Sequence, residues 1–263
     1  MKGLKLFLTA GVFTALGLTG VNAADSTKIT TVDELNACIK ANGTCVLQND
    51  LTTDEVIVNG EGVKTVIDLN GKTLYSWITV SEKGELTVKD SGSNGSIAKR
   101  STVDVLTGGK FILDGGTIDA SDKGNGIWVE NATFIMNGGK VIVHGPTNSG
   151  NAALDYDKTF EITGGELIAI GASGMSQSPS SNSSQSFIFT NVQNQKEDSE
   201  ILLKDLNGNE IVKCNSIKSF SNIVISSPKL EKGEKYELYI NSSKISDVTA
   251  GEITSGNKMQ GKR

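Results

Sequence analysis

A short pattern of apolar and polar positions recurs along most of the chain. Two apolar residues spaced two apart are followed by a polar residue, then by Gly, and then by further apolar residues. The clearest copies span residues 67–74, 111–118, 134–141 and 160–167, with a degraded copy over 86–97. The aligned polar positions are Asn70, Lys89, Asp114, Asn137 and Thr163, which are 19, 25, 23 and 26 residues apart. A period of about 23 residues is typical of solenoid proteins.

Short apolar segments between these copies predict a second strand in each repeat. They span residues 55–58, 77–80, 103–106, 127–129 and 153–156. Alternation places Phe111, Leu113 and Ile118 on one side of the chain. One coil cannot bury that side alone, whereas coils stacked ~4.8 Å apart bury it continuously and pair each strand in parallel with the next copy. The pattern therefore predicts an all-β fold, a right-handed parallel β-helix of roughly five to seven coils.

Two other architectures fit the pattern less well. A β-sandwich would not keep the Gly-Gly pairs, which suit corners with positive φ, in phase with the apolar pairs. A leucine-rich-repeat horseshoe needs Leu and Asn at fixed positions that this sequence lacks. The β-helix remains the prediction.

Both ends of a parallel solenoid need protection. Thr31-Val32-Asp33-Glu34 is a capping-box start that predicts a short helix to about Lys40, with Leu35 and Ile39 facing the first coil. Beyond the repeats, five segments predict the antiparallel strands of a C-terminal β module: 187–189, 201–203, 211–212, 223–225 and 236–240. The expected organisation is an N-terminal cap over 24–50, a β-helix over 51–186, and the C-terminal module with a polar tail over 187–263.

The first residues have the features of a signal peptide. Lys2 and Lys5 form a positive region, residues 6–18 an apolar one, and Val21-Asn22-Ala23 a cleavage site. We expect residues 1–23 to be removed and the protein to be secreted to the extracellular space or cell surface, with no membrane insertion after cleavage. The alternative is a membrane-anchoring helix, for which the stretch is short.

Charge and cysteine content exclude several functions. The 263 residues carry a formal net charge of −5, and loss of Lys2 and Lys5 makes it −5 − 2 = −7; an acidic chain argues against nucleic-acid binding. The single His and three Cys without a Cys-x-x-Cys pattern argue against a zinc site or a His-dependent triad. Cys38 and Cys45 are close enough to form a disulfide in an exported protein, or they are two buried thiols.

An oxygen-rich cluster is the candidate metal site. Asn151, Asp155 and Asp157 lie close together in the sequence, and the two carboxylates flank Tyr156, so on a strand both point to the same side. If Tyr156 faces the core, both carboxylates face solvent and could share a calcium ion, with further oxygen ligands from neighbouring coils. The alternative is that these residues only form turns.

Four aromatic residues are candidates for stacking on sugar rings. They are Tyr75, Trp77, Trp128 and Tyr156. Exposed Trp and Tyr side chains on a flat parallel sheet would form a carbohydrate-binding platform. The alternative is that they fill the core. Outward orientation of both Trp residues on the same side would favour binding.

No catalytic residues are predicted. A β-helix lyase needs a basic residue beside calcium, but the two Arg residues are Arg100 and the terminal Arg263, and nothing links Arg100 to the acidic cluster. A hydrolase would need two carboxylates at fixed spacing on one side. An acidic polymer would be repelled by this acidic protein unless calcium or local Lys residues bridge it, so either calcium is bound or the ligand is neutral.

Three segments resemble a known family. Residues 144–157, the 168–185 segment with Gly-Met-Ser-Gln and its Ser-rich tail, and residues 226–236 are similar to secreted clostridial-type β-helix carbohydrate-binding domains, over roughly residues 105–240. The resemblance implies binding of cellulose or acidic sugars such as pectic polymers, a fold related to polysaccharide lyases, and bound calcium. It also implies that the Ser-rich segment, which composition alone predicts to be a linker, is ordered.

Together these observations predict a secreted, non-catalytic protein that binds cellulose or a pectic or other acidic polysaccharide with calcium assistance. One alternative is a cell-surface adhesin or structural β-helix protein whose ligand is another protein or the cell wall. The second alternative is a calcium-dependent polysaccharide lyase.

Overall fold

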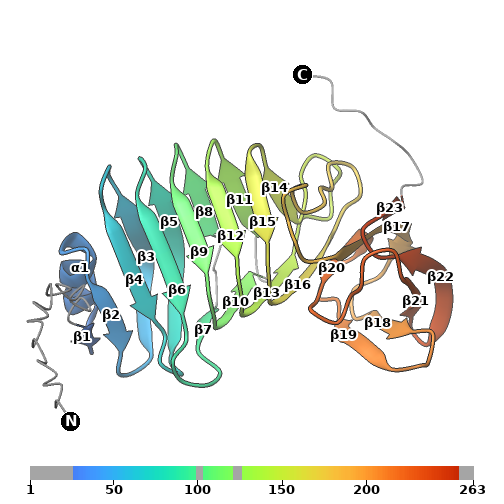
Figure 1. Ribbon diagram of the computed structural model, residues 1–263, viewed down its shortest axis with the longest axis horizontal. Helices are drawn as coiled ribbons and strands as arrows, with labels where there is room; N and C mark the ends of the chain where they lie inside the picture. The colour runs from blue at the N-terminus through green and yellow to red at the C-terminus, as the bar shows by residue number, and fades with distance from the viewer. Residues whose placement is uncertain (1–25, 99–102, 121–125, 255–263) are drawn as a thin grey trace, which may run out of the picture.

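The computed structural model describes residues 26–98, 103–120 and 126–254, which form one α-helix and 23 β-strands. The predicted signal peptide and residues 255–263 of the polar tail lie outside the described residues. Within the described ranges, no helix is long and apolar enough to cross a membrane. The fold is a parallel β-helix of about five turns followed by an antiparallel module, as predicted (Figure 1).

One side of the solenoid is a parallel sheet in which successive coils each contribute one strand and β1, which precedes helix α1, pairs with the first of them (Figure 1). Its strands, in spatial order, are β1 (Ser26–Ile29), β2 (Thr44–Leu47), β4 (Lys64–Asp68), β6 (Glu85–Lys89), β9 (Lys110–Leu113), β12 (Thr133–Met136) and β15 (Thr159–Ile162). From β2 onward, adjacent strands come from consecutive repeats. Each step of about 23 residues along the sequence therefore advances the chain by one strand along the axis of the solenoid.

A second sheet forms the other two sides. The long strands β3 (Leu51–Asn59) and β5 (Thr73–Ser81) run through both sides, since the start of β5 pairs with β7 and its end with β8. One side continues as β7 (Ser96–Ala98), β10 (Thr117–Ala120), β13 (Lys140–His144) and β16 (Glu166–Gly171). The other continues as β8 (Val103–Leu106), β11 (Ile127–Glu130) and β14 (Leu154–Tyr156).

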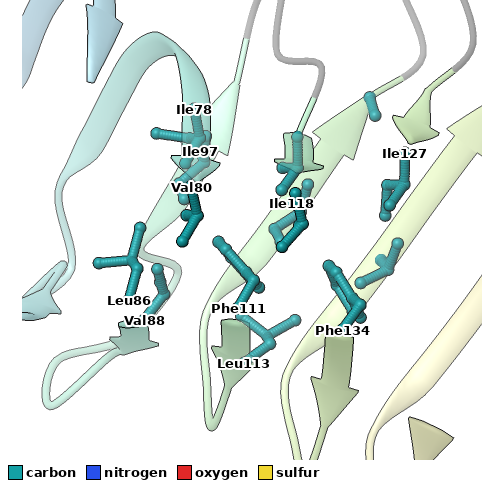
Figure 2. Packing of buried hydrophobic residues seen from close by; sticks show 14 of the residues in the cluster. Ile78, Val80, Leu86, Val88, Ile97, Phe111, Leu113, Ile118, Ile127 and Phe134 are labelled. Atoms are coloured by element: carbon teal, nitrogen blue, oxygen red, sulfur yellow. The ribbon is translucent and has the colours of Figure 1, made fainter. Parts of the chain in front are cut away.

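The core is built from aligned inward positions of successive coils (Figure 2). Phe111, Phe134 and Phe160 occupy the same register on β9, β12 and β15 and are fully buried. Their rings stack at centroid distances of 5.0 Å and 4.6 Å. Aliphatic rows such as Val80, Val105 and Val129 fill the rest of the interior.

The Gly-Gly pairs form corners, as the sequence pattern predicts. The second Gly of one pair, Gly139, has φ of +73°, and a Cβ atom there would lie 2.4 Å from the carbonyl oxygen of Gly116 in the preceding coil. Only Gly satisfies both the positive φ and the close approach of the two coils. The adjacent polar residues form a ladder, with Asn137 donating to Asp114 and Thr163 donating to Asn137.

The N-terminal end is covered by helix α1 (Val32–Lys40), which confirms the predicted helix. Thr31 and Glu34 form the capping box, and Leu35 and Ile39 are buried against the solenoid. A disulfide joins Cys38 of the helix to Cys45 of β2, which decides between the two alternatives left by the sequence.

The C-terminal end is covered by antiparallel strands. The strands β20 (Phe220–Ser226) and β17 (Phe187–Gln195) extend the second sheet, because β20 pairs antiparallel with both β16 and β17. The short strand β23 (Ile253–Thr254) then pairs parallel with β17. A separate antiparallel sheet of β18 (Glu200–Asp205), β19 (Glu210–Asn215), β21 (Lys235–Ile240) and β22 (Ser243–Thr249) encloses a second core with the extension. Ile168 and Ile170 of β16 belong to this second core, so β16 is buried on both sides.

The Ser-rich segment after β16 is packed against the last coil and is not an extended linker. The hydroxyl groups of Ser180 and Ser183 accept hydrogen bonds from the backbone N–H groups of Phe160 and Ile162. The side chain of Gln177 accepts from the backbone N–H of Tyr156 and donates to its carbonyl oxygen. Short polar side chains thus satisfy the strand edges that a further coil would otherwise pair. Composition alone could not show this.

Candidate functional site

One side of the solenoid exposes both Trp residues. We call it the tryptophan face and define it by the outward residues of β3 from Glu55 on, of β5 from Trp77 on, and of β8, β11 and β14. They are Glu55, Ile57, Asn59, Trp77, Thr79, Ser81, Asp104, Leu106, Trp128, Glu130 and Asp155. Trp77 is 43% exposed and Trp128 is 36% exposed. These are large exposed fractions for Trp, so neither side chain fills the core.

Strand pairing determines how the two indoles are spaced. Asp104 is the register partner of Thr79 on one side and of Trp128 on the other, and Asp155 is the next partner of Trp128. Trp77 lies two strands from Trp128 and two residues out of register. With ~4.8 Å between strands and ~3.3 Å per residue, the Cα atoms of the two Trp residues are about 12 Å apart. The face therefore presents two separate aromatic groups.

The indole of Trp77 is held by a carboxylate from the next coil. Its Nε1–H donates to Oδ2 of Asp104 at 3.2 Å. Burial raises the pKa of Asp104 above its usual range, the Trp77 hydrogen bond opposes this rise, and the charge of Glu55 adds to it. Glu55 in turn accepts a hydrogen bond from the hydroxyl of Thr79. These hydrogen bonds fix the orientation of Trp77.

The predicted calcium ligands lie at the end of the tryptophan face. Burial raises the pKa of Asp155, and the charge of Asp157 raises it further, so the two carboxylates interact. However, Asp157 accepts from the backbone N–H of Asn131, and Asn151 accepts from that of Ala152. The described part of the chain contains no group of three or more His, Cys, Asp or Glu side chains that could hold a metal. The calcium site stays a prediction.

Two of the four aromatic candidates lie outside the tryptophan face. Tyr156 points inward: its ring packs against Phe160 at a centroid distance of 6.0 Å and its hydroxyl donates to the carbonyl oxygen of Ser178. Tyr75 lies on the adjoining side, because its register partner is Ala98 of β7. We therefore remove Tyr156 and Tyr75 from the aromatic platform and retain Trp77 and Trp128.

The single His has a structural position. His144 is 4% exposed, and its Nδ1 accepts a hydrogen bond from the backbone N–H of Ile217 at 2.9 Å. Burial, with a smaller contribution from the charge of Lys218, lowers the pKa of His144 to about 4. The neutral imidazole thus links β13 of the solenoid to the segment between β19 and β20.

Sequence reasoning missed three carboxylates of this face, Glu55, Asp104 and Glu130. It also missed two aliphatic residues, Ile57 and Leu106. The signal for them was present. They occupy outward positions of the second strand in each repeat, which alternate with buried Val and Ile residues. Aligning the second strands by their apolar positions would have placed Asp104 beside Trp128.

Comparisons of the chain with protein-family models, with curated proteins and with solved structures find no match. The fold class is therefore defined by the geometry, and the resemblance to carbohydrate-binding domains stays a prediction.

Proposed function

We propose that this protein is a non-catalytic polysaccharide-binding β-helix that uses the tryptophan face. The observation that carries the proposal is the outward orientation of Trp77 and Trp128 on one run of parallel strands. Indole rings offer apolar surfaces on which the C–H faces of sugar rings stack, while neighbouring polar groups bind hydroxyl groups. Thr79, Asp104 and Asp155 provide such groups between and beside the indoles.

Rigidity of the face supports this function. Every strand that carries the tryptophan face also supplies buried residues to the solenoid core, such as Val105 beside Asp104 and Val129 beside Trp128. Ligand binding to a preorganised surface avoids the entropic cost of ordering it. A long polymer that stacks on two fixed indoles gains from both contacts at once.

We propose that the protein works outside the cell. The disulfide between Cys38 and Cys45 supports this location, since disulfides persist mainly in oxidising compartments. The predicted signal peptide over residues 1–23 agrees with export.

The test is a pull-down with insoluble cellulose, with and without a chelator. The variants Trp77→Ala and Trp128→Ala should each weaken binding about tenfold, because truncation of a well-packed Trp costs ~1–2 kcal/mol. Leu206→Ala is the matched control, since Leu206 is 63% exposed but lies between β18 and β19.

Binding by the double Trp variant as tight as that of the unmodified protein would overturn the proposal. The chelator arm addresses calcium separately: binding that disappears with chelator would place calcium in the site, and unchanged binding would remove calcium while leaving the tryptophan face as the ligand surface.

A further inference from the structure

The geometry points to a polysaccharide that carries free amino groups as the preferred ligand of the tryptophan face, so that protonated amines pair with Asp104 and Asp155 while the sugar rings stack on the indoles. This inference rests on the proposed function. It narrows the ligand from polysaccharides in general to amino-sugar polymers that are not acetylated at nitrogen.

The first observation is the charge of the face. Its outward carboxylates are Glu55, Asp104, Glu130 and Asp155. The strand segments that form it, residues 55–59, 77–81, 103–106, 127–130 and 154–156, contain no Lys, Arg or His. Among the described residues, none of the ion pairs involves these four carboxylates. On the side of the solenoid formed by β4, β6 and β9, by contrast, Glu85 forms ion pairs with Lys64 and Lys110.

The second observation is the position of the charges relative to the aromatic groups. Asp104 and Asp155 are the register partners of Trp128 on the two neighbouring strands. The Cα atom of each therefore lies about 4.8 Å from the Cα atom of Trp128, which is the spacing between strands. A sugar ring stacked on the indole of Trp128 would have its substituents above these carboxylates. An ammonium group there would also benefit from the negative face of the indole.

The third observation is that the carboxylates are poorly solvated. Asp104 and Asp155 are each partly buried, and each faces a second carboxylate, Glu55 and Asp157 respectively. A cation at each position would relieve this repulsion, whereas a neutral ligand would leave it unchanged and an anionic polymer would increase it.

A polysaccharide is favoured over a basic peptide because the surface carries two separated indoles. Lysine side chains would use the carboxylates without needing two ring-stacking positions. Sugar rings in a polymer use both features, and consecutive rings along one chain can reach both Trp77 and Trp128.

The experiment compares three soluble β-1,4-linked oligosaccharides that share one backbone and differ only at carbon 2: a hydroxyl group in the glucose polymer, an acetamido group in the N-acetylglucosamine polymer, and an ammonium group in the glucosamine polymer. Affinities are measured by calorimetry at a pH where the amine is protonated, at low and high salt. We expect the glucosamine oligomer to bind about tenfold tighter than the other two, as two partly exposed ion pairs of ~0.2–1 kcal/mol each would give.

The charge variants isolate the cause. Asp104→Asn combined with Asp155→Asn should reduce the ratio of glucosamine-oligomer affinity to glucose-oligomer affinity to about one, because both negative charges are removed while the amide oxygen introduced at position 104 can still accept from Trp77. The matched control is Glu231→Gln with Glu234→Gln, two exposed residues between β20 and β21 that change the net charge equally. The control variant should keep the preference, and high salt should lower it.

Several results would overturn the inference while leaving the proposed function standing. One is equal affinity for all three oligomers together with loss of binding in the Trp variants. Another is tighter binding of the acetylated oligomer than of the glucosamine oligomer. The third is a preference for the glucosamine oligomer that survives in the Asp104→Asn/Asp155→Asn variant. Oligolysine that binds as tightly as the glucosamine oligomer and ignores the Trp variants would show a basic protein partner instead. Failure of all three oligomers to bind would overturn both proposals.

Discussion

Acid should weaken the junction between the solenoid and the C-terminal module through His144. The buried imidazole is neutral in the folded protein, because its Nδ1 accepts the Ile217 backbone N–H and its surroundings lower its pKa to about 4. In the unfolded chain the same side chain has a pKa of about 6.5. Between these two values the unfolded state binds a proton that the folded state does not, so the free energy of unfolding falls as the pH falls.

The size of the effect follows from the two pKa values. Each pKa unit corresponds to ~1.36 kcal/mol, so the loss relative to pH 7 reaches about 2 kcal/mol at pH 5 and about 3 kcal/mol at pH 4. Well above pH 6.5, where the imidazole is neutral in both the folded and the unfolded state, His144 causes no pH dependence. A loss of ~3 kcal/mol is a large share of the ~5–15 kcal/mol that stabilises a typical domain.

The assay is urea unfolding at several pH values from 7 to 4, comparing the unmodified protein with His144→Asn. Asn can accept the Ile217 hydrogen bond but does not titrate. Carboxylates elsewhere contribute equally to both proteins, so the difference between the two pH profiles isolates His144. His144→Ala, which lacks the acceptor, should instead lose ~1–3 kcal/mol even at pH 7. Parallel profiles for the unmodified protein and His144→Asn would refute the reasoning.

Three further predictions concern the solenoid. Phe134→Ala, which empties the middle of the buried ring stack, should lower the free energy of unfolding by ~3–5 kcal/mol in urea titrations. Replacing both Cys38 and Cys45 with Ser should lower the free energy of unfolding by about 2 kcal/mol, because the disulfide closes a short loop. Thermal unfolding with and without reductant measures this loss, and equal transition temperatures for the unmodified protein and the variant without reductant would contradict it. In urea titrations, Gly139→Ala should lower the free energy of unfolding more than Gly208→Ala does. Both positions have positive φ, which costs Ala ~1–2 kcal/mol. Of these two positions, only Gly139 has a backbone oxygen where the Cβ atom would lie.

The repeat architecture could be predicted because each coil contains the same pattern of apolar and polar residues. Phe111, Phe134 and Phe160 are separated by 23 and 26 residues and differ little in their neighbours, so their alignment was visible before their stacking was known. The helix after Thr31 was predictable for a local reason, since its capping box lies within four residues. Interactions that recur in every coil, or that join residues a few positions apart in the sequence, can be recognised from the sequence alone.

The site was only partly predictable because it depends on where the chain turns between sides. Tyr75 and Trp77 are two residues apart and should share a side if β5 were one flat strand. In the structure, β5 passes from one side of the solenoid to the next, which separates their register partners. The packing of the Ser-rich segment was hidden for a related reason: hydroxyl groups that cap strand edges and hydroxyl groups of a linker have the same composition.

The solenoid also explains why the tryptophan face can combine features that no single coil contains. Asp104, Trp128 and Asp155 come from three successive coils and become neighbours only through parallel pairing of β8, β11 and β14. The inward residues between them fix this pairing, since a slip of one residue would move Val105 and Val129 to solvent. Register of the core therefore determines the register of the tryptophan face. Because each outward position is free of that constraint, the face can place carboxylates next to indoles without loss of packing, and under the proposed function these outward residues would set its ligand preference.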